Sequence, residues 1–242
     1  MSGAHLVVDD IDVRYGNARA LSGVSLDIEP GSAIAILGAN GAGKSSLARA
    51  ITGVVTPSRG QVTIDGQRVT RWSPHRIARL GVAHVPEGRG IFPGLTVLDN
   101  LRIGLRHSVA RRDRDDAIGR ALARFPILAE RLSQGAGSLS GGQQQMLALA
   151  RVLAAPPRLL VADELSLGLA PILIDEVFDA LREARSRGAT LVLVEQFVGR
   201  ALDVCDTAVI LRRGHIVWQG STSDAEAAAA EAYLGGTAST DS

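Results

Sequence analysis

The chain has 242 residues, which is enough for one large α/β domain or for a core domain with a smaller inserted subdomain. Its residues are 46% hydrophobic, which excludes a disordered tail, and its formal net charge of +1 gives no reason to expect nucleic acid as a partner. The single cysteine excludes an internal disulfide bond. Because no apolar run is long enough to cross a bilayer and no secretion signal is evident, we expect a cytoplasmic chain.

The first third of the chain is predicted to be rich in β-strands. We expect strands at residues 6–8, 11–15, 24–28, 32–37, 61–65 and 82–85. The run at 32–37 is short, apolar and bounded by glycine, as is typical of a strand buried on both faces. A helix is expected to follow it, from residue 44 to residue 52.

The middle of the chain, residues 96–155, has a helical pattern instead. Apolar spacing predicts helices at residues 96–105, 113–125 and 143–154. Strand patterns then resume at residues 159–162, 190–194, 207–211 and 216–219, with one helix around residues 173–184 and another at 225–232. This order predicts an α/β core interrupted by a helical insertion.

A phosphate-binding loop is indicated by residues 38–45, whose sequence is G-A-N-G-A-G-K-S. Glycines allow successive backbone N–H groups to curve around phosphate oxygens, and the helix N-terminus adds partial positive charge. Lys44, the only lysine in the chain, should reach the β- and γ-phosphates of ATP, and Ser45 should offer its hydroxyl to Mg²⁺. A chance glycine-rich turn is the alternative. The expected ATP contacts are Gly38, Asn40, Gly41, Gly43, Lys44, Ser45 and Ser46.

Two carboxylates follow the apolar run at residues 159–162. A buried strand would deliver Asp163 to the phosphate side of the sheet, where it can hold the Mg²⁺ shell. Glu164 would then orient or deprotonate the attacking water. The pair alone could also be an ordinary strand end or a helix cap.

A third motif, L-S-G-G-Q at residues 139–143, lies between these two. Ser140, Gly141 and Gly142 offer hydrogen-bond donors at the start of a predicted helix. The three motifs in this order resemble those of ABC ATPases, in which two chains enclose two ATP molecules head to tail. The resemblance implies that residues 140–143, Gln143 included, face the γ-phosphate bound by the other subunit.

The resemblance covers about residues 6–235 and implies a fold. This is a P-loop NTPase core with an antiparallel β layer and an inserted helical subdomain. A single domain would span residues 4–236, with the core at 4–90 and 158–236, the helical subdomain at about 91–157, and a flexible tail at 237–242. In this family an aromatic at the position of Tyr15 stacks on adenine. Glu87 occupies the hinge before the insertion and is expected near Mg²⁺.

Several positions indicate a branch of the family. Glu87 replaces the usual hinge glutamine, Gln196 replaces a histidine, and residues 166–171, S-L-G-L-A-P, replace a segment with an aspartate. These features resemble one ATPase subunit of importers for branched-chain amino acids; urea importers are the alternative. Leu165 replaces the usual proline after the two carboxylates, which frees a backbone N–H and relaxes φ.

Gln196 is expected to act in catalysis by donating a hydrogen bond, although it cannot carry a proton charge as histidine can. This suggests two unequal ATP sites and a different ATPase subunit as partner. The resemblance further implies transmembrane permease subunits, an extracytoplasmic solute-binding protein acting indirectly, and a peripheral location on the inner face of the membrane. The competing interpretations are an ABC ATPase that acts on nucleic acid or ribosomes, a nucleotide kinase or GTPase, and a binding module without catalysis.

Overall fold

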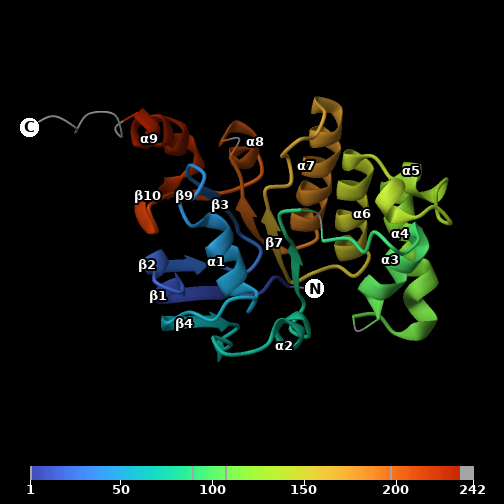
Figure 1. Ribbon diagram of the computed structural model, residues 1–242, viewed down its shortest axis with the longest axis horizontal. Helices are drawn as coiled ribbons and strands as arrows, with labels where there is room; N and C mark the ends of the chain where they lie inside the picture. The colour runs from blue at the N-terminus through green and yellow to red at the C-terminus, as the bar shows by residue number, and fades with distance from the viewer. Residues whose placement is uncertain (1, 89, 107, 197, 235–242) are drawn as a thin grey trace, which may run out of the picture.

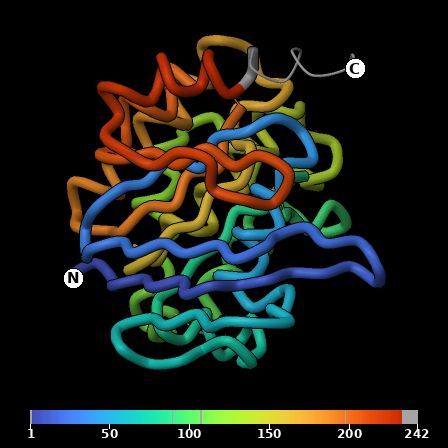
Figure 2. The backbone as a smooth tube through the Cα atoms, turned by 90° about the vertical axis from the view of Figure 1, so that its left-hand side faces the viewer, coloured from blue at the N-terminus to red at the C-terminus, as the bar shows by residue number. Residues whose placement is uncertain are grey.

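The computed structural model describes residues 2–88, 90–106, 108–196 and 198–234, and in this part of the chain the strands form two sheets (Figure 1). One is an antiparallel four-stranded sheet in the order β2-β1-β4-β5. Its strands are β1 (Leu6–Tyr15), β2 (Ala18–Ile28), β4 (Arg59–Ile64) and β5 (Gln67–Arg68). Figure 2 shows the β1–β2 hairpin, in blue, between the segment that contains β4 and the C-terminal strands.

The second sheet has six strands in the order β10-β9-β3-β8-β7-β6. All neighbours are parallel except β9 and β10. Its strands are β3 (Ala33–Leu37), β6 (Val82–Val85), β7 (Leu159–Asp163), β8 (Thr190–Val194), β9 (Thr207–Arg212) and β10 (His215–Ser221). Parallel strands bring their carboxyl ends to one edge of a sheet, and ligands bind in α/β proteins at such edges.

Helices cover the six-stranded sheet and form a group at one side of the molecule (Figure 1). The α-helices are α1 (Lys44–Ile51), α2 (Pro74–Ala78), α3 (Val97–Leu105), α4 (Arg114–Arg124), α5 (Pro126–Ala129), α6 (Gly141–Leu153), α7 (Pro171–Ser186), α8 (Val198–Leu202) and α9 (Thr222–Leu234). Two 3₁₀ turns, η1 (Arg111–Asp113) and η2 (Ala136–Ser138), lie among them. None of the helices in the described ranges is both long and apolar enough to span a bilayer.

Strand β3 contributes to both halves of the hydrophobic core. Its alternate residues Ala33, Ala35 and Leu37 face a cluster that includes side chains of α3, α6 and α7, whereas Ile34 and Ile36 face the antiparallel sheet and α1. All five residues are buried, which confirms the prediction of a strand covered on both faces. The loop that follows β3 is therefore anchored in the centre of the protein.

The structure joins or lengthens several predicted elements. The strands expected at residues 6–8 and 11–15 are one strand, β1, because an irregularity between Val8 and Ile11 absorbs the break in alternation. Asp10 has a positive φ of 49° at this point. The helix expected from residue 143 begins at Gly141, because Ser140 caps it. The short elements β5, α2, α5 and α8 were not predicted.

The predicted helical insertion corresponds to α3–α6, which lie between β6 and β7 in the chain. Leu101 of α3 and Leu193 of β8 belong to one continuous hydrophobic cluster. The division of the domain at about residues 91 and 157 stays a prediction. Its expected end at residue 236 and the tail at 237–242 lie outside the described residues.

Candidate functional site

The phosphate loop folds back on itself between β3 and α1. Gly43 has a φ of 110°, and a Cβ atom there would lie 2.6 Å from the carbonyl oxygen of Ala20. The Lys44 Nζ atom donates to the carbonyl oxygen of Gly38 at 2.9 Å and to that of Ala39 at 3.4 Å. Because the Lys44 side chain is only 3% exposed, these bonds fix its ammonium group inside the loop.

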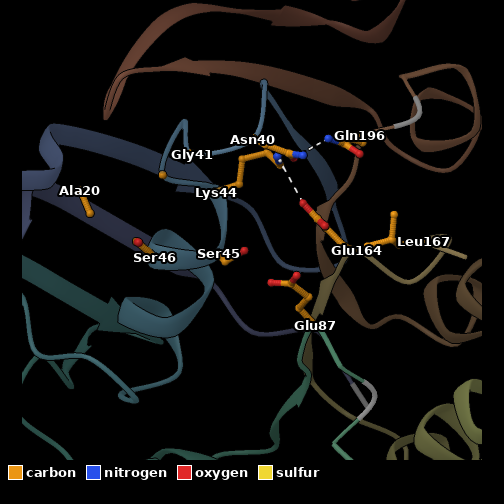
Figure 3. Close-up of a pocket in the computed structure, with 11 residues that line it drawn as sticks. Ala20, Asn40, Gly41, Lys44, Ser45, Ser46, Glu87, Glu164, Leu167 and Gln196 are labelled. Carbon is orange, nitrogen blue, oxygen red and sulfur yellow. Dashed lines mark hydrogen bonds and ion pairs between the residues drawn. The ribbon is translucent and has the colours of Figure 1, made fainter. Parts of the chain in front are cut away.

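A cleft of about 330 Å³ opens over this loop. Figure 3 shows Lys44, Ser45 and Ser46 on one side and Glu87 and Glu164 on the other. The lining residues are Ala20, Asn40, Gly41, Gly43, Lys44, Ser45, Ser46, Glu87, Glu164, Leu167 and Gln196. The structure therefore brings the two predicted motifs together although more than 100 residues separate Ser45 from Glu164.

Asp163 ends β7 beside the first turn of α1. The Ser45 hydroxyl donates to Asp163 Oδ1 at 3.1 Å. The pKa of Asp163 is raised to about 6: burial raises it most, the negative charges of Glu164 and Glu87 add to the rise, and the hydrogen bond from Ser45 opposes it. Carboxylate and hydroxyl oxygens are ligands that suit Mg²⁺, and a cation would offset the excess negative charge. The residues present therefore fit this ion.

Glu164 faces Lys44 across the cleft. Its Oε1 atom lies 3.4 Å from Lys44 Nζ, and its side chain is 11% exposed (Figure 3). The backbone has a φ of 51°, and its N–H donates to the carbonyl oxygen of Val194 at 2.9 Å. A positive φ is costly for a residue with a side chain, so surrounding contacts must hold this conformation.

Gln196 follows β8 and contacts the phosphate loop. Its Nε2 atom donates to Asn40 Oδ1, so the two predicted site residues lie against each other (Figure 3). Gln196 also lines the cleft, together with Glu164 and Lys44. Gln196 therefore lies beside the phosphate loop, as the sequence predicted.

Glu195 is a buried residue of this region to which the sequence assigned no role. It is 1% exposed, and its carboxylate accepts hydrogen bonds from the Ser166 hydroxyl at 2.6 Å and the Ser166 backbone N–H at 3.2 Å. Burial raises its pKa, while the bonds from Ser166 and the Gln196 backbone oppose the rise. A carboxylate directly after the apolar run of β8 was the available signal, since such groups are seldom buried without partners.

The residues of the L-S-G-G-Q motif at 139–143 are not among those that line the cleft. The Ser140 hydroxyl accepts from the Gln143 N–H at 3.3 Å, and Gln143 Oε1 accepts from the Ser140 N–H at 3.0 Å, which makes a capping box at the start of α6. Gly141 and Gly142 form the first turn. Gly142 is packed closely, because a Cβ atom there would lie 2.0 Å from Leu173 Cδ1.

Tyr15 also lies outside the set of residues that line the cleft within the described ranges. It is 44% exposed at the end of β1. The paired strand of the same hairpin, β2, supplies Ala20 to the lining of the cleft. Residues 85–89 have the sequence V-P-E-G-R, and Arg89 among them lies outside the described residues. Glu87 of the same segment is exposed and lines the cleft.

Comparison with protein families finds a match to the ABC transporter model over residues 21–166. The chain is 39% identical to the high-affinity branched-chain amino acid transport ATP-binding protein BraG of Pseudomonas aeruginosa, over 96% of this chain and 100% of that protein. It is 36% identical to the probable branched-chain amino acid transport ATP-binding protein LivF of Archaeoglobus fulgidus, over 88% and 91% of the two chains.

Solved structures are similar in fold as well. The crystal structure of the ADP conformation of an ATP-binding cassette from an ABC transporter superposes with a TM-score of 0.81 at 26% identity, covering 96% of this chain and 99% of that chain. A second structure, the ATP-binding subunit of an ABC transporter, gives a TM-score of 0.82 at 27% identity, covering 98% and 95%. Both similarities extend over nearly the whole chain, so the chain has the fold of an ABC transporter ATP-binding cassette.

Proposed function

The chain belongs to the ABC transporter family and is an ATPase of the ATP-binding-cassette type, and from this premise we propose that it powers the import of branched-chain or other hydrophobic amino acids. The cargo is supported by the names of BraG and LivF, which match the chain over most of its length. It is also supported by Glu87, Gln196 and the S-L-G-L-A-P segment at residues 166–171.

One observation carries the proposed chemistry: Lys44 and Glu164 face each other in a cleft that Ser45 also lines. Lys44 and the glycine-rich loop bind the phosphates of ATP, and Glu164 orients or deprotonates the attacking water. Ser45, Asp163 and Glu87 would hold Mg²⁺, which would supply charge neutralisation at the phosphates. Gln196 donates a hydrogen bond toward the same phosphates, at the position where its side chain now meets Asn40.

Tyr15 stacks on the adenine ring in this proposal. Tyr15 is partly exposed at the end of β1, and stacking on adenine would add apolar contact at a site otherwise built for phosphate. The neighbouring Ala20 lines the cleft, so a nucleotide held by the phosphate loop extends toward this hairpin.

A second ATPase subunit completes each ATP site. Residues 140–143 lie outside the cleft of their own chain, although a helix N-terminus favours bound phosphate. We infer that Ser140, Gly141, Gly142 and Gln143 face the γ-phosphate held by the partner. Because Gln196 cannot carry a proton charge as histidine can, the two sites of a heteromeric pair would be unequal.

The remaining partners are transmembrane permease subunits, which would hold the chain on the inner face of the membrane, and a solute-binding protein that acts through them. The segment around Glu87 and the helical part of the chain would contact the permeases, and closure of the two ATPase subunits on ATP would drive them between inward- and outward-facing states. We place the helical subdomain at about residues 91–157.

The ATPase proposal is tested with the Glu164→Gln variant. It should bind ATP with unchanged affinity and lose nearly all hydrolysis, because the base is removed while the phosphate loop is kept. The exposed Glu226→Gln variant, with the same change of charge on α9, is the control. Hydrolysis by Glu164→Gln at the rate of the natural chain would refute the role of Glu164.

The transport proposal is tested by isolating the tagged chain from its native membranes in mild detergent. Mass spectrometry should identify hydrophobic permease subunits and a second ATPase among the proteins that copurify. Uptake of radiolabelled leucine into cells should then fall when the Glu164→Gln chain replaces the natural one. Recovery of the chain alone, or with ribosomes, would overturn the transport reading while leaving the ATPase in place.

A further inference from the structure

Glu195 connects the end of β8 to the loop that carries Glu164. Its carboxylate accepts two hydrogen bonds from Ser166, one from the hydroxyl and one from the backbone N–H. The backbone of Gln196, the next residue, also favours the ionised form of this carboxylate. All of these donors lie in a region where Glu195 is 1% exposed and Ser166 is 2% exposed, so water competes little for them.

The loop after β7 needs such a restraint. Glu164 has a positive φ of 51°, which is an unfavourable conformation for a residue with a side chain. Leu165 stands where ABC ATPases usually have proline, so the ring that would limit φ at this point is absent. The restraints on this loop include the hydrogen bond from the Glu164 N–H to the Val194 carbonyl oxygen, the buried Leu165 side chain, and the Ser166 contacts to Glu195.

The Glu195 backbone and the next residue, Gln196, connect this region to β3 and to the phosphate loop. The Glu195 backbone N–H donates to the carbonyl oxygen of Ile36 in β3 at 3.3 Å. Gln196, the next residue, contacts Asn40. Residues 195 and 196 therefore link the two loops whose side chains, Lys44 and Glu164, face each other across the cleft (Figure 3).

We propose that Glu195 is a positioning residue for ATP hydrolysis, which acts through Ser166 to hold the Glu164 carboxylate in line with Lys44. The inference rests on the proposed role of Glu164. Hydrolysis is sensitive to the placement of the attacking water, and a shift of about 1 Å in a catalytic group can cost roughly 100-fold in rate. In the proposed function ATP binding depends on Tyr15 and residues 38–46, and it needs no such alignment.

The experiment compares Glu195→Ala and Glu195→Gln in the full chain, isolated with its membrane partners. Glu195→Ala removes the acceptor of both Ser166 bonds. Glu195→Gln keeps the shape of the side chain, and its amide can accept from the Ser166 N–H and donate to the Ser166 hydroxyl. The matched control is Thr190→Val at the other end of β8. It removes buried hydrogen bonds of the Thr190 hydroxyl to the Ala4 carbonyl oxygen and the Gly31 N–H without touching the loop.

We expect Glu195→Ala to lower kcat by about 10- to 100-fold while KM for ATP changes by less than about twofold. Glu195→Gln should keep kcat within about threefold of the natural chain. Hydrogen exchange should accelerate in residues 164–168 of Glu195→Ala and stay unchanged in the phosphate loop. The double variant Ser166→Ala, Glu195→Ala should lose no more kcat than Glu195→Ala alone. The hydrogen bond that Ser166→Ala removes is already absent in Glu195→Ala.

Three results would overturn the inference. The first is an unchanged kcat in Glu195→Ala. The second is a loss of kcat in Thr190→Val as large as that in Glu195→Ala, which would indicate a general effect of lost stability. The third is a failure of Glu195→Gln to retain activity. Glu164→Gln, measured alongside, separates the two proposals: if it hydrolyses ATP normally, the role of Glu164 fails, whereas if it alone is inactive, only the role of Glu195 fails.

Discussion

Replacement of Asp163 by asparagine should stabilise the protein in the absence of Mg²⁺ and nucleotide. Burial and two nearby carboxylates raise the pKa of Asp163 from 3.8 to about 6, so its ionised form is disfavoured in the folded state. This difference corresponds to about 3 kcal/mol at pH 7.5, where the carboxylate is charged in both states. Asparagine removes the charge, and its carbonyl oxygen can still accept from the Ser45 hydroxyl.

The sign of the effect fixes its pH dependence. A raised pKa in the folded state means that the folded protein binds more protons, so the advantage of Asp163→Asn should be complete above pH 6 and vanish below pH 3.8. For a chain of this length, about 3 kcal/mol corresponds to a rise in Tm of about 6 to 12 °C.

The measurement is thermal unfolding at pH 7.5 and at pH 3.5 in EDTA, with Glu226→Gln on α9 as a control for the change of net charge. Added Mg²⁺ and ATP should then stabilise the natural chain more than Asp163→Asn, because the variant lacks a carboxylate ligand. A variant that is no more stable than the natural chain in EDTA at pH 7.5 would refute the reasoning, as would an advantage that persists at pH 3.5.

Three further predictions follow from single positions. Burial lowers the pKa of folded His84 to about 4, so the natural chain loses up to about 3 kcal/mol of stability between pH 6.5 and pH 4 as the unfolded imidazole takes up a proton. His84→Gln should reduce this loss. Urea titrations at several pH values that give the same change of unfolding free energy with pH in both chains would contradict this. Gly43→Ala should weaken ATP binding by more than about tenfold, since its Cβ atom would lie 2.6 Å from the Ala20 carbonyl oxygen. Gly41→Ala should weaken binding less, because Gly41 also has a positive φ but has open space around it. Fluorescent nucleotide titrations that show the reverse order would contradict this explanation. Ser140→Ala should cost about 1 kcal/mol by removing the cap of α6, and an unchanged urea midpoint would disprove it.

The motifs that lie in short continuous segments were predictable from sequence. Strand β3, the glycine-rich loop and α1 follow one another within 20 residues, and each carries its own signal of burial, backbone freedom or helix start. The family match confirms the ABC ATPase identification made from these motifs. Asp163 and Ser45 are far apart in sequence. Their proximity could still be predicted, because both were assigned to Mg²⁺.

The features that sequence did not predict depend on tertiary contacts. Strand β5 has two residues and α8 has five, so neither carries a periodic pattern. Asp9 and Asp10 interrupt the alternation of β1, but pairing with β2 and β4 on both sides keeps the strand continuous. Glu195 was given no role from sequence, since its partner Ser166 lies 29 residues away and nothing local indicates which buried donor it meets.

The solitary lysine has a practical consequence for chemical labelling. Reagents that acylate primary amines find a single side-chain target in this chain, Lys44, and that amine is enclosed by the carbonyl oxygens of Gly38 and Ala39. The extent of acylation at this one position therefore reports how often the loop opens, and its suppression by ligand can be followed on the intact mass of the protein. Amine-directed immobilisation or cross-linking, by contrast, has almost nothing on the surface to attach to, so arginine- or carboxylate-directed reagents are needed for those purposes.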